Sequence, residues 1–370
     1  MNRILVTGGL GFIGSHTVDL LIEKGYSVTV LDNLEKQVHL GKTPIYKNEK
    51  ADYIFGDIRH GKSWLKALKD ADGIIHLAGA VGIGQSFWEP KKYLDVNVSS
   101  TGLMYQIIVK NPDIRKRITK IVIASSKSLY GEGIYSCKNH GTFSPDIRPK
   151  NQLERREWEL KCPVCEYNML PKGITEDKLP QNLNPYSLSK YATERLAVDY
   201  SYLLGIKTVA FRYFNVYGER QSLSNPYTGV MAIFLSRLKN NNPPFLFEDG
   251  KQLRDYIYVK DVAKFNTIAL EKGEGIYNLG TGKPTSLREI VLMLNRGLGT
   301  NVDPTISNEF RPGDNRHDYA NLDRLKKDFG DVKLVEMNEG INKLIEWSKS
   351  EKSIDKFEMQ EMERKKYISK

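Results

Sequence analysis

A glycine-rich turn near the start of the chain constrains its fold more than any other feature. Residues 3–7 are predicted to be a strand, residues 12–24 a helix, and the turn between them carries Gly8, Gly11 and Gly14. In such a unit the first glycine permits a tight turn, the second lets the backbone approach a pyrophosphate, and the third lets the helix pack on the strand. The free N–H groups at the helix start would face phosphates. The sequence therefore predicts a dinucleotide-binding unit.

An acidic residue after the second predicted strand indicates which dinucleotide binds. Asp32 follows the predicted strand 27–31 and lies eighteen residues beyond Gly14. A carboxylate there accepts hydrogen bonds from a ribose diol and repels a 2′-phosphate, so NAD is expected over NADP. The alternative is a glycine-rich turn without a ligand. The combined spacing of strand, helix and acid favours cofactor binding.

Alternating apolar and helical segments extend this unit into a larger sheet. The predicted strands are residues 3–7, 27–31, 52–55, 73–77, 120–125 and 207–212, and the predicted helices are residues 12–24, 62–69, 91–110 and 186–204. This alternation indicates an α/β fold, a doubly wound parallel sheet of the Rossmann type with helices on both faces. Ligands should bind at the carboxyl ends of its strands.

The chain is expected to divide into three parts. Residues 1–220 form an NAD-binding Rossmann domain, and residues 221–347 mainly form a smaller mixed α/β lobe for the substrate. Residues 348–370 are a highly charged tail, expected to be a solvated helix or a frayed end. Residues 132–182 interrupt the first part, are polar, and carry five prolines and all three cysteines. They form an insertion far longer than an ordinary loop.

The charge of the chain limits its partners. The formal net charge is +10, but basic residues are interleaved with acidic ones, as in residues 154–157. Because no basic stripe with interleaved aromatic residues occurs, nucleic-acid binding is not expected, whereas an enzyme for phosphate-bearing substrates is compatible with this charge. No apolar run reaches membrane-spanning length. The first strand begins too early to leave room for a signal peptide, so a cytoplasmic location is expected.

A tyrosine and a lysine four residues apart are candidates for acid–base chemistry. Tyr186 and Lys190 open the predicted helix 186–204, so their side chains lie on one helix face. A lysine ammonium beside a phenol stabilises the phenolate and lowers the pKa of the tyrosine. The alternative is a surface helix, because this spacing is common by chance. Behind a dinucleotide-binding turn, the pair favours catalysis.

The order of these and further motifs resembles the extended short-chain dehydrogenase/reductase family, in its branch of nucleotide-sugar epimerases and dehydratases. The matching segments are residues 7–14, 31–34, 56–58, 76–79, Asn97, 125–126, 130–131, 186–190 and 212–218. The resemblance covers nearly the whole chain outside the insertion. It implies an enzyme that uses NAD, acts on a nucleotide-diphosphate sugar, and forms homodimers through helices 91–110 and 186–204.

The resemblance also implies a role for each matching residue. Tyr186 would take the sugar hydroxyl proton as hydride leaves, Lys190 would hold the nicotinamide ribose, and Ser126 would hydrogen-bond the reacting oxygen. The implied NAD-binding residues are Gly8, Gly11, Phe12, Ile13, Gly14, Asp32, Asn33, Asp57, Ile58, Leu77, Ala78, Gly79, Asn97 and Lys190. The implied substrate-binding residues are Gln85, Ser86, Ser126, Tyr186, Asn215, Arg254, Arg311 and Asp314.

Two arginines of the lobe match family segments that grip the pyrophosphate of the nucleotide sugar. They are Arg254 and Arg311. A planar guanidinium suits this task because it can donate two parallel hydrogen bonds. The alternative for Arg254 is a surface ion pair with the neighbouring Asp255.

The residue after Ser126 separates the reactions of this branch. Dehydratases of the branch carry an acid there and decarboxylases keep a glutamate close by, whereas this chain has Lys127. The resemblance therefore implies a 4-epimerase, in which hydride leaves C4, the 4-keto sugar rotates, and hydride returns to the other face. A 4,6-dehydratase, a 4-keto reductase and a non-catalytic NAD-binding scaffold remain as alternatives.

Four residues of the insertion have the spacing of a metal site. Cys137 and His140 form one pair, Cys162 and Cys165 form the other, and two residues separate the members of each pair. This spacing is typical of a tetrahedral structural zinc site, and incidental cysteines are the alternative. The pattern is similar to that of dTDP-L-rhamnose 4-epimerases, although Glu166 stands where that subgroup usually has glycine. One structural zinc per chain is expected.

Overall fold

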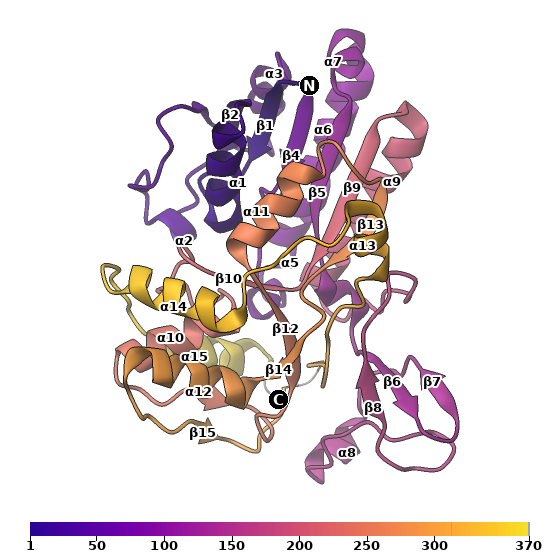
Figure 1. Ribbon diagram of the computed structural model, residues 1–370, viewed down its shortest axis with the longest axis vertical. Helices are drawn as coiled ribbons and strands as arrows, with labels where there is room; N and C mark the ends of the chain where they lie inside the picture. The colour runs from indigo at the N-terminus through magenta and orange to yellow at the C-terminus, as the bar shows by residue number, and fades with distance from the viewer. Residues whose placement is uncertain (312, 369–370) are drawn as a thin grey trace.

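The computed structural model describes residues 1–311 and 313–368. Pro312, within the Arg311–Asp314 motif, and the last two residues of the predicted tail lie outside the described residues. Figure 1 shows a layered α/β part at the top, a smaller lobe at the lower left, and the insertion at the lower right.

A parallel sheet forms the centre of the layered part. Its seven strands are β1 (Arg3–Thr7), β2 (Ser27–Asp32), β3 (Asp52–Phe55), β4 (Gly73–His76), β5 (Lys120–Ser126), β9 (Lys207–Tyr213) and β13 (Gly275–Leu279). They are arranged in the order β13-β9-β5-β4-β1-β2-β3. The predicted Rossmann-type sheet is confirmed, and its six predicted strands agree with the structure to within one residue at each end. The chain order reverses between β1 and β4, the place where such sheets bind ligands.

Helices cover both faces of this sheet. One face carries α1 (Phe12–Glu23), α11 (Val259–Ile268) and α13 (Asp323–Phe329), and the other carries α3 (Gly61–Leu68), α6 (Ser100–Lys110), α7 (Pro112–Arg117) and α9 (Pro185–Leu204). The strand side chains alternate accordingly, because Ile4 and Val6 pack against the first set of helices and Leu5 against the second. Burial of both faces explains the apolar runs from which the strands were predicted.

The predicted helix 91–110 has an irregular start. It consists of α5 (Pro90–Tyr93), a π-helical segment η1 (Leu94–Ser99) and α6. Three further short helices accompany the sheet: α2 (Lys36–His39), α4 (Ile83–Ser86) and the 3₁₀ turn η2 (Lys127–Tyr130). Asn97 of η1 and Lys127 and Ser128 of η2 belong to the candidate site or adjoin it.

The smaller lobe packs three helices against short strands. The helices are α10 (Val230–Lys239), α12 (Leu287–Leu298) and α14 (Met337–Ser348), and the strands are β10 (Asn215–Tyr217), β11 (Phe245–Leu246), β12 (Leu253–Tyr258), β14 (Pro284–Ser286) and β15 (Thr305–Ile306). Leu235, Ile290 and Leu344, one from each helix, meet in its core. The lobe is interleaved with the layered part, since α11, β13 and α13 return to the central sheet.

The insertion forms a small sheet of its own. Strands β6 (Ile134–Cys137), β7 (Gly141–Phe143) and β8 (Leu170–Lys172) pair antiparallel in the order β7-β6-β8, and α8 (Lys150–Glu154) lies beside them. Its core is limited to a few buried side chains, including Tyr135, Leu160 and Met169. Both the insertion and the lobe lie at the carboxyl end of the sheet (Figure 1).

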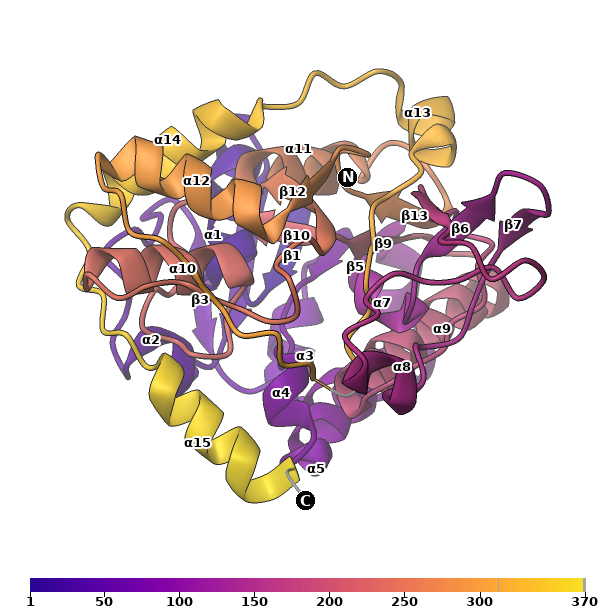
Figure 2. The same ribbon diagram turned by 90° about the horizontal axis from the view of Figure 1, so that it is seen from below.

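The charged tail folds back on the molecule. It ends in helix α15 (Phe357–Ile368), which crosses the lower edge of the view in Figure 2. Asn242 donates to Asp355 at 2.7 Å, and the Arg237 guanidinium lies over the Phe357 ring at 4.5 Å. The tail is therefore docked on the lobe through specific contacts, and this differs from the solvated or frayed end that its charge suggests.

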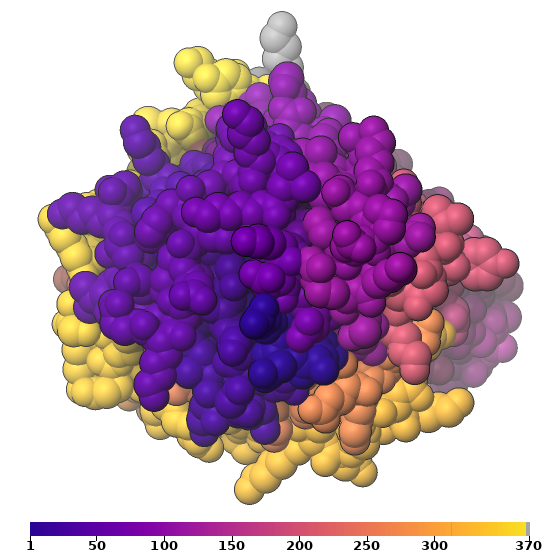
Figure 3. Space-filling model, turned by 90° about the horizontal axis from the view of Figure 1, so that it is seen from above, coloured from indigo at the N-terminus to yellow at the C-terminus, as the bar shows by residue number. Residues whose placement is uncertain are grey.

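The end of the molecule that lies away from the lobe and the insertion is covered mainly by the first half of the chain, coloured indigo to magenta in Figure 3. Within the described ranges, every helix is too short or too polar to cross a membrane.

Candidate active site

The glycine turn places helix α1 directly against the end of β1. Gly8 has a φ of +67°, which favours glycine, and a Cβ on Gly14 would lie 2.0 Å from the Gly8 carbonyl oxygen. No side chain caps the first turn of α1, because its N-cap residue is Gly11. Backbone N–H groups at such a helix start can bind phosphate oxygens. Phe12 and Ile13 begin the helix beside them.

Asp32 is fixed at the rim of this turn by two backbone donors. Its carboxylate accepts hydrogen bonds from the Leu10 N–H at 3.0 Å and the Leu34 N–H at 2.9 Å. Beyond it, the Asn33 amide donates to Asp57 at 3.2 Å. Hydrogen bonds from the Arg59 side chain lower the pKa of Asp57 to about 2. The structure therefore brings together the predicted ribose and adenine residues.

Ile58 and residues 77–79 line the neighbouring strand ends. Ile58 is buried, and Leu77–Gly79 follow β4 next to the glycine turn, where Gly8 approaches the Ala78 backbone. A Cβ on Gly79 would lie 3.0 Å from the Asn97 Oδ1 and 3.2 Å from the Lys190 Nζ. Residues predicted from three separate motifs therefore meet at one point.

Asn97 anchors this meeting point from the π-helical segment η1. Its amide donates to the Ala80 carbonyl at 3.0 Å and to the Ser189 hydroxyl at 2.8 Å, and its oxygen accepts from the Ala80 N–H at 2.8 Å. π-helical segments are rare and frequently lie at functional sites. Here the distorted turn links β4 to helix α9.

Lys190 is buried and Tyr186 is half-buried at the amino end of α9. The helix start is fixed by a capping box between Asn184 and Ser187, with Pro185 at its first position. Burial raises the pKa of Tyr186, and a hydrogen bond with Ser126, at the end of β5, opposes that rise. The sequence predicts that Lys190 lowers the Tyr186 pKa, and this prediction is wrong for the structure, because burial holds that pKa above its ordinary value.

In the structure the Lys190 ammonium donates to the Ala124 carbonyl at 3.0 Å. Burial lowers the pKa of Lys190 to about 8. The cation is therefore placed between β5 and Gly79.

Two side chains that contact Tyr186 or Ser126 were not identified from the sequence. The Tyr93 ring meets the Tyr186 ring edge-on at 6.1 Å between centroids, and its hydroxyl donates to the Val81 carbonyl at 2.9 Å. The Ser128 hydroxyl lies 2.9 Å from the Ser126 hydroxyl. Ser128 stands two residues from Ser126 and could have been considered, whereas nothing in the sequence pattern indicates Tyr93.

The predicted sugar-pocket residues Gln85 and Ser86 lie in the short helix α4. Both are buried. The Ser86 hydroxyl donates to the Ile83 carbonyl at 2.7 Å, and the Gln85 amide donates to Gln37 at 3.1 Å. Asn215, in β10, donates to the Asp255 carbonyl at 2.8 Å. These three predicted residues thus have protein partners in the structure.

The two predicted pyrophosphate arginines differ in their surroundings. Arg254 is inside the lobe and donates to the Arg316 and Asn315 carbonyls, each at 2.9 Å. Asp255 does not pair with it, since its carboxylate accepts from Thr281, Gly282 and Ala320. The alternative of an Arg254–Asp255 surface pair is therefore not formed.

Arg311 is more exposed. Its guanidinium lies 2.7 Å from the Asp314 carboxylate and 4.4 Å from the centre of the Phe247 ring, and 41% of its side chain is accessible. Of the two arginines, Arg311 keeps the more accessible guanidinium.

Lys127 joins the end of β5 to the lobe. Its Nζ lies 2.6 Å from the Asp318 carboxylate, which also lies 3.4 Å from the Arg254 Nε. Burial raises the pKa of Asp318, but the Lys127 and Arg254 cations outweigh this effect and hold that pKa below its ordinary value. A paired cation therefore occupies the position that carries an acid in dehydratases of the branch.

The four predicted metal ligands lie together in the insertion. Their ligand atoms all lie within 4.8 Å of one another. The Cys137 Sγ is 3.5 Å from the His140 Nδ1 and 3.6 Å from the Cys165 Sγ, and the Cys162 Sγ is 3.6 Å from the same His140 nitrogen. A tetrahedral zinc site with Zn–S bonds of about 2.3 Å implies ligand separations of about 3.8 Å. The donor set and its spacing therefore fit zinc.

Glu166 adopts the turn conformation that a glycine would favour. Its φ is +61°, and its N–H donates to the Cys162 carbonyl at 2.9 Å. The departure from glycine at this position has not prevented the turn around Cys162 and Cys165.

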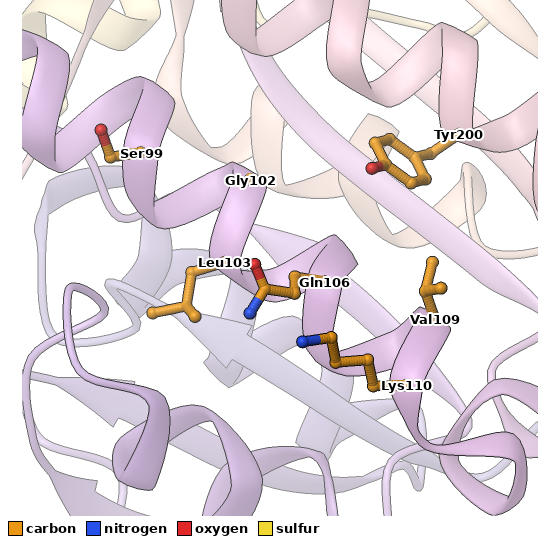
Figure 4. A pocket seen from close by; sticks show the side chains of 7 residues that line it. All are labelled: Ser99, Gly102, Leu103, Gln106, Val109, Lys110 and Tyr200. Atoms are coloured by element: carbon orange, nitrogen blue, oxygen red, sulfur yellow. The ribbon is translucent and has the colours of Figure 1, made fainter.

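A shallow hollow lies on the outer face of the predicted dimer helices. It has a volume of about 500 Å³ and is lined by Ser99, Gly102, Leu103, Gln106, Val109, Lys110 and Tyr200 (Figure 4). These residues come from η1, α6 and α9. The face combines apolar and polar side chains and lies away from Tyr186.

Comparison with known proteins gives a consistent picture. Residues 164–280 match the model of the NAD dependent epimerase/dehydratase family, and residues 5–145 match that of GDP-mannose 4,6 dehydratase. The dTDP-L-rhamnose 4-epimerase of Burkholderia thailandensis is 32% identical over 93% of this chain and 94% of its own length.

Solved structures resemble the fold over the same extent. The UDP-glucose 4-epimerase of Thermotoga maritima with UDP-glucose has a TM-score of 0.75 and 28% identity, covering 94% of this chain and 98% of its own. The UDP-glucose 4-epimerase of Thermus thermophilus with NAD has a TM-score of 0.73 and 28% identity, covering 94% and 99%. With its glycine turn, Ser126, Tyr186 and Lys190 in the places described, the chain belongs to the NAD-dependent epimerase/dehydratase family.

Proposed function

We propose that this protein is an NAD-dependent epimerase that inverts C4 of a nucleotide-diphosphate sugar. The observation that carries the proposal is the meeting of Ser126, Tyr186 and Lys190 beside the glycine turn. Relatives named as 4-epimerases of dTDP- and UDP-sugars support the substrate class.

The residues around the glycine turn fit NAD. Its N–H groups suit a pyrophosphate, and the Asp32 carboxylate suits a ribose diol rather than a 2′-phosphate. When bound, NAD supplies the acceptor and donor of the hydride at the sugar carbon. Asn33, Asp57 and Ile58 would surround the adenine end, and Lys190, Asn97 and Leu77–Gly79 the nicotinamide end.

The chain's own residues handle the proton. Tyr186 takes it from the sugar hydroxyl while Ser126 hydrogen-bonds the same oxygen, and Tyr186 returns it when the opposite stereoisomer forms. Lys190 would hold the nicotinamide ribose. Asn215, Gln85 and Ser86 border the sugar, and Arg311, Asp314 and Arg254 the phosphate end.

Lys127 favours epimerisation over dehydration. Elimination of water needs an acid near the reacting sugar, and the position after Ser126 instead holds a lysine paired with Asp318. A 4,6-dehydratase or a 4-keto reductase would release a product of different mass, so the choice can be tested directly.

The proposal includes one structural zinc ion per chain. Cys137, His140, Cys162 and Cys165 would fill a tetrahedral shell and leave no position for substrate water. The ion would stabilise an insertion whose own apolar core is small.

The proposal also includes a homodimer and a cytoplasmic location. The α6–α9 face with its hollow would bury apolar surface against a second copy. None of the three cysteines, all of them described residues, is in a disulfide, which suits a reducing compartment.

Turnover on a panel of nucleotide sugars tests the function. UDP-glucose, UDP-N-acetylglucosamine and dTDP-L-rhamnose are incubated with the protein in D₂O without added cofactor, and the products are followed by NMR and mass spectrometry. We expect a C4 epimer of unchanged mass, because the hydride returns from the same cofactor. Deuterium at C3 or C5 or loss of water would instead indicate another reaction of the family, as would consumption of NADPH in a parallel incubation to which NADPH is added. Absence of turnover on a wider panel would favour a scaffold.

A further inference from the structure

A buried cluster of charged residues joins the insertion to the lobe. It consists of Arg148, Arg316, Glu132, Glu159, Glu248 and Asp249, and we call it the Arg148–Arg316 cluster. Arg316 has no accessible surface, and Arg148 and Glu248 are almost as buried. Burying so many charges is costly unless each is paired. Nothing in the proposed chemistry uses these residues directly.

Each guanidinium in the cluster bridges the two parts. Arg148, from the insertion, lies 2.8 Å from Glu248 of the lobe. Arg316, from the lobe, lies 2.6 Å from Glu159 of the insertion and 2.8 Å from both Glu248 and Asp249. The insertion and the lobe thus each contribute one arginine that pairs with a carboxylate of the other part.

The cluster also holds the backbone of residues 313–318. Arg148 donates to the Asp314 carbonyl at 3.1 Å. Glu132 accepts from the Arg316 N–H at 2.9 Å, and the Tyr135 hydroxyl accepts from the His317 N–H at 3.1 Å. Three residues of the insertion therefore fix a stretch of irregular backbone in the lobe.

This stretch leads to the reacting centre. It begins beside Arg311 and ends at Asp318, whose carboxylate pairs with Lys127 next to Ser126. Its carbonyls at Asn315 and Arg316 also hold the Arg254 guanidinium. A displacement of residues 313–318 would therefore move the proposed phosphate-binding arginines and the partner of Lys127 together.

We infer that the insertion is a positioning element for substrate binding, which acts through the Arg148–Arg316 cluster. Arg148 and Arg316 are positioning residues: they contact the backbone or carboxylates that orient Arg311 and residues 313–318. The inference rests on the proposed function, because it takes that stretch to contact the nucleotide diphosphate. It assigns the insertion a role in substrate affinity in addition to any metal it holds.

The test compares Arg148→Met with the wild-type holoenzyme. Met keeps much of the side-chain volume but removes the charge and the bond to the Asp314 carbonyl. The expected result is an increase in KM of at least about tenfold with kcat within about threefold, because affinity is lost while the reacting groups stay in place. The affinity for UDP or dTDP, measured by isothermal titration calorimetry, should fall by a similar factor. Bound NAD should be unchanged.

Hydrogen exchange provides a readout that does not need turnover. The amides of residues 314–318 should exchange faster in Arg148→Met than in the wild type. Arg148→Lys, which keeps the charge, should restore part of the UDP or dTDP affinity. If Arg148→Met cannot be purified folded, Arg148→Lys alone is measured, and a weaker but parallel change in KM and exchange is expected.

Arg237→Met is the matched control. Arg237 is similarly buried on α10 and pairs at 3.3 Å with Asp355, which belongs to the C-terminal tail rather than to the Arg148–Arg316 cluster. It should lose stability without a change in KM. If Arg148→Met has the same KM, nucleotide affinity and hydrogen-exchange rates as the wild type, the inference is wrong and the proposed function stays intact. A wild-type protein that neither binds UDP or dTDP nor turns over any nucleotide sugar would remove the proposed function and the inference with it.

Discussion

Lys190 is buried and Tyr186 is half-buried, and in each case burial works against the charged form of the side chain. Burial raises the pKa of the phenol and lowers the pKa of the ammonium. Catalysis needs a lowered pKa at the phenol. The charges of bound ligands should therefore influence the Tyr186 pKa as much as the neighbouring side chains do. Ser126 already contributes in the required direction through its hydrogen bond.

Replacing Tyr186 by Phe should abolish turnover and preserve the fold. The variant lacks the phenol that moves the proton, and general acid–base catalysis of this kind contributes about 10² to 10⁴-fold. NAD content, measured after denaturation, should equal that of the wild type. Activity within about threefold of the wild type would show that another group moves the proton.

Replacing Lys190 by Met should lower activity and raise the thermal stability of the protein without substrate. The folded-state pKa of about 8 lies below the ordinary 10.5, so between these values the unfolded chain binds more protons and stability rises with pH. The burial cost is therefore fully present below pH 8 and is relieved as the pH approaches 10.5. Met carries no such cost.

Thermal melts at two pH values check the Lys190→Met prediction. The variant should have the higher Tm at pH 7, and its advantage should shrink at pH 10. The stabilisation that added NAD gives should be smaller in the variant than in the wild type. An equal Tm difference at both pH values would show that the ammonium is not responsible.

At the scale of elements, the sequence pattern predicts the buried sheet better than its edges and attachments. The six strands up to β9 are apolar runs followed by recognisable motifs, and all are present in the structure. The edge strand β13 was missed because Gly275 and Asn278 interrupt its apolar pattern and its pairing with β9 spans a whole lobe. The small sheet of the insertion was missed because its strands are only three or four residues long and β7 and β8 carry no buried side chain.

In the candidate site, too, some features were predicted from the sequence and others were not. The resemblance placed Asn97, Gly79 and Lys190 in one binding site, and the structure brings the three residues together. The partners of Arg254 and Lys127 could not be predicted, since Asn315, Arg316 and Asp318 come from an irregular segment without a periodic pattern. Such contacts depend on tertiary packing rather than on local sequence.

Loss of zinc should destabilise the insertion before the rest of the protein. Protein purified without chelator should contain one zinc per chain, and Cys162→Ser should lower this content, because a serine hydroxyl is a much poorer zinc ligand than a thiolate. Elemental analysis measures the metal, and limited proteolysis should cut the variant within residues 132–182. Cys→Ser variants with unchanged metal content and protease resistance would exclude the site.

At the scale of the whole molecule, the hollow on α6 and α9 predicts how two copies associate. Leu103→Arg would place an unpaired charge in the proposed interface, so light scattering after size-exclusion chromatography should show a monomer. Leu292→Arg is the control, because Leu292 is an exposed leucine on α12, outside the hollow. A dimer that tolerates Leu103→Arg would place the interface elsewhere.

The late position of β13 in the chain has a consequence for biosynthesis. The ribosome must complete residues 214–274, and thus much of the lobe, before the strand that closes one edge of the sheet emerges. Until then β9 presents unpaired N–H and C=O groups, which are a template for pairing with other chains. A nascent chain that pauses before β13 has emerged is therefore the species most prone to aggregate. Chaperone binding should have its largest effect on that species.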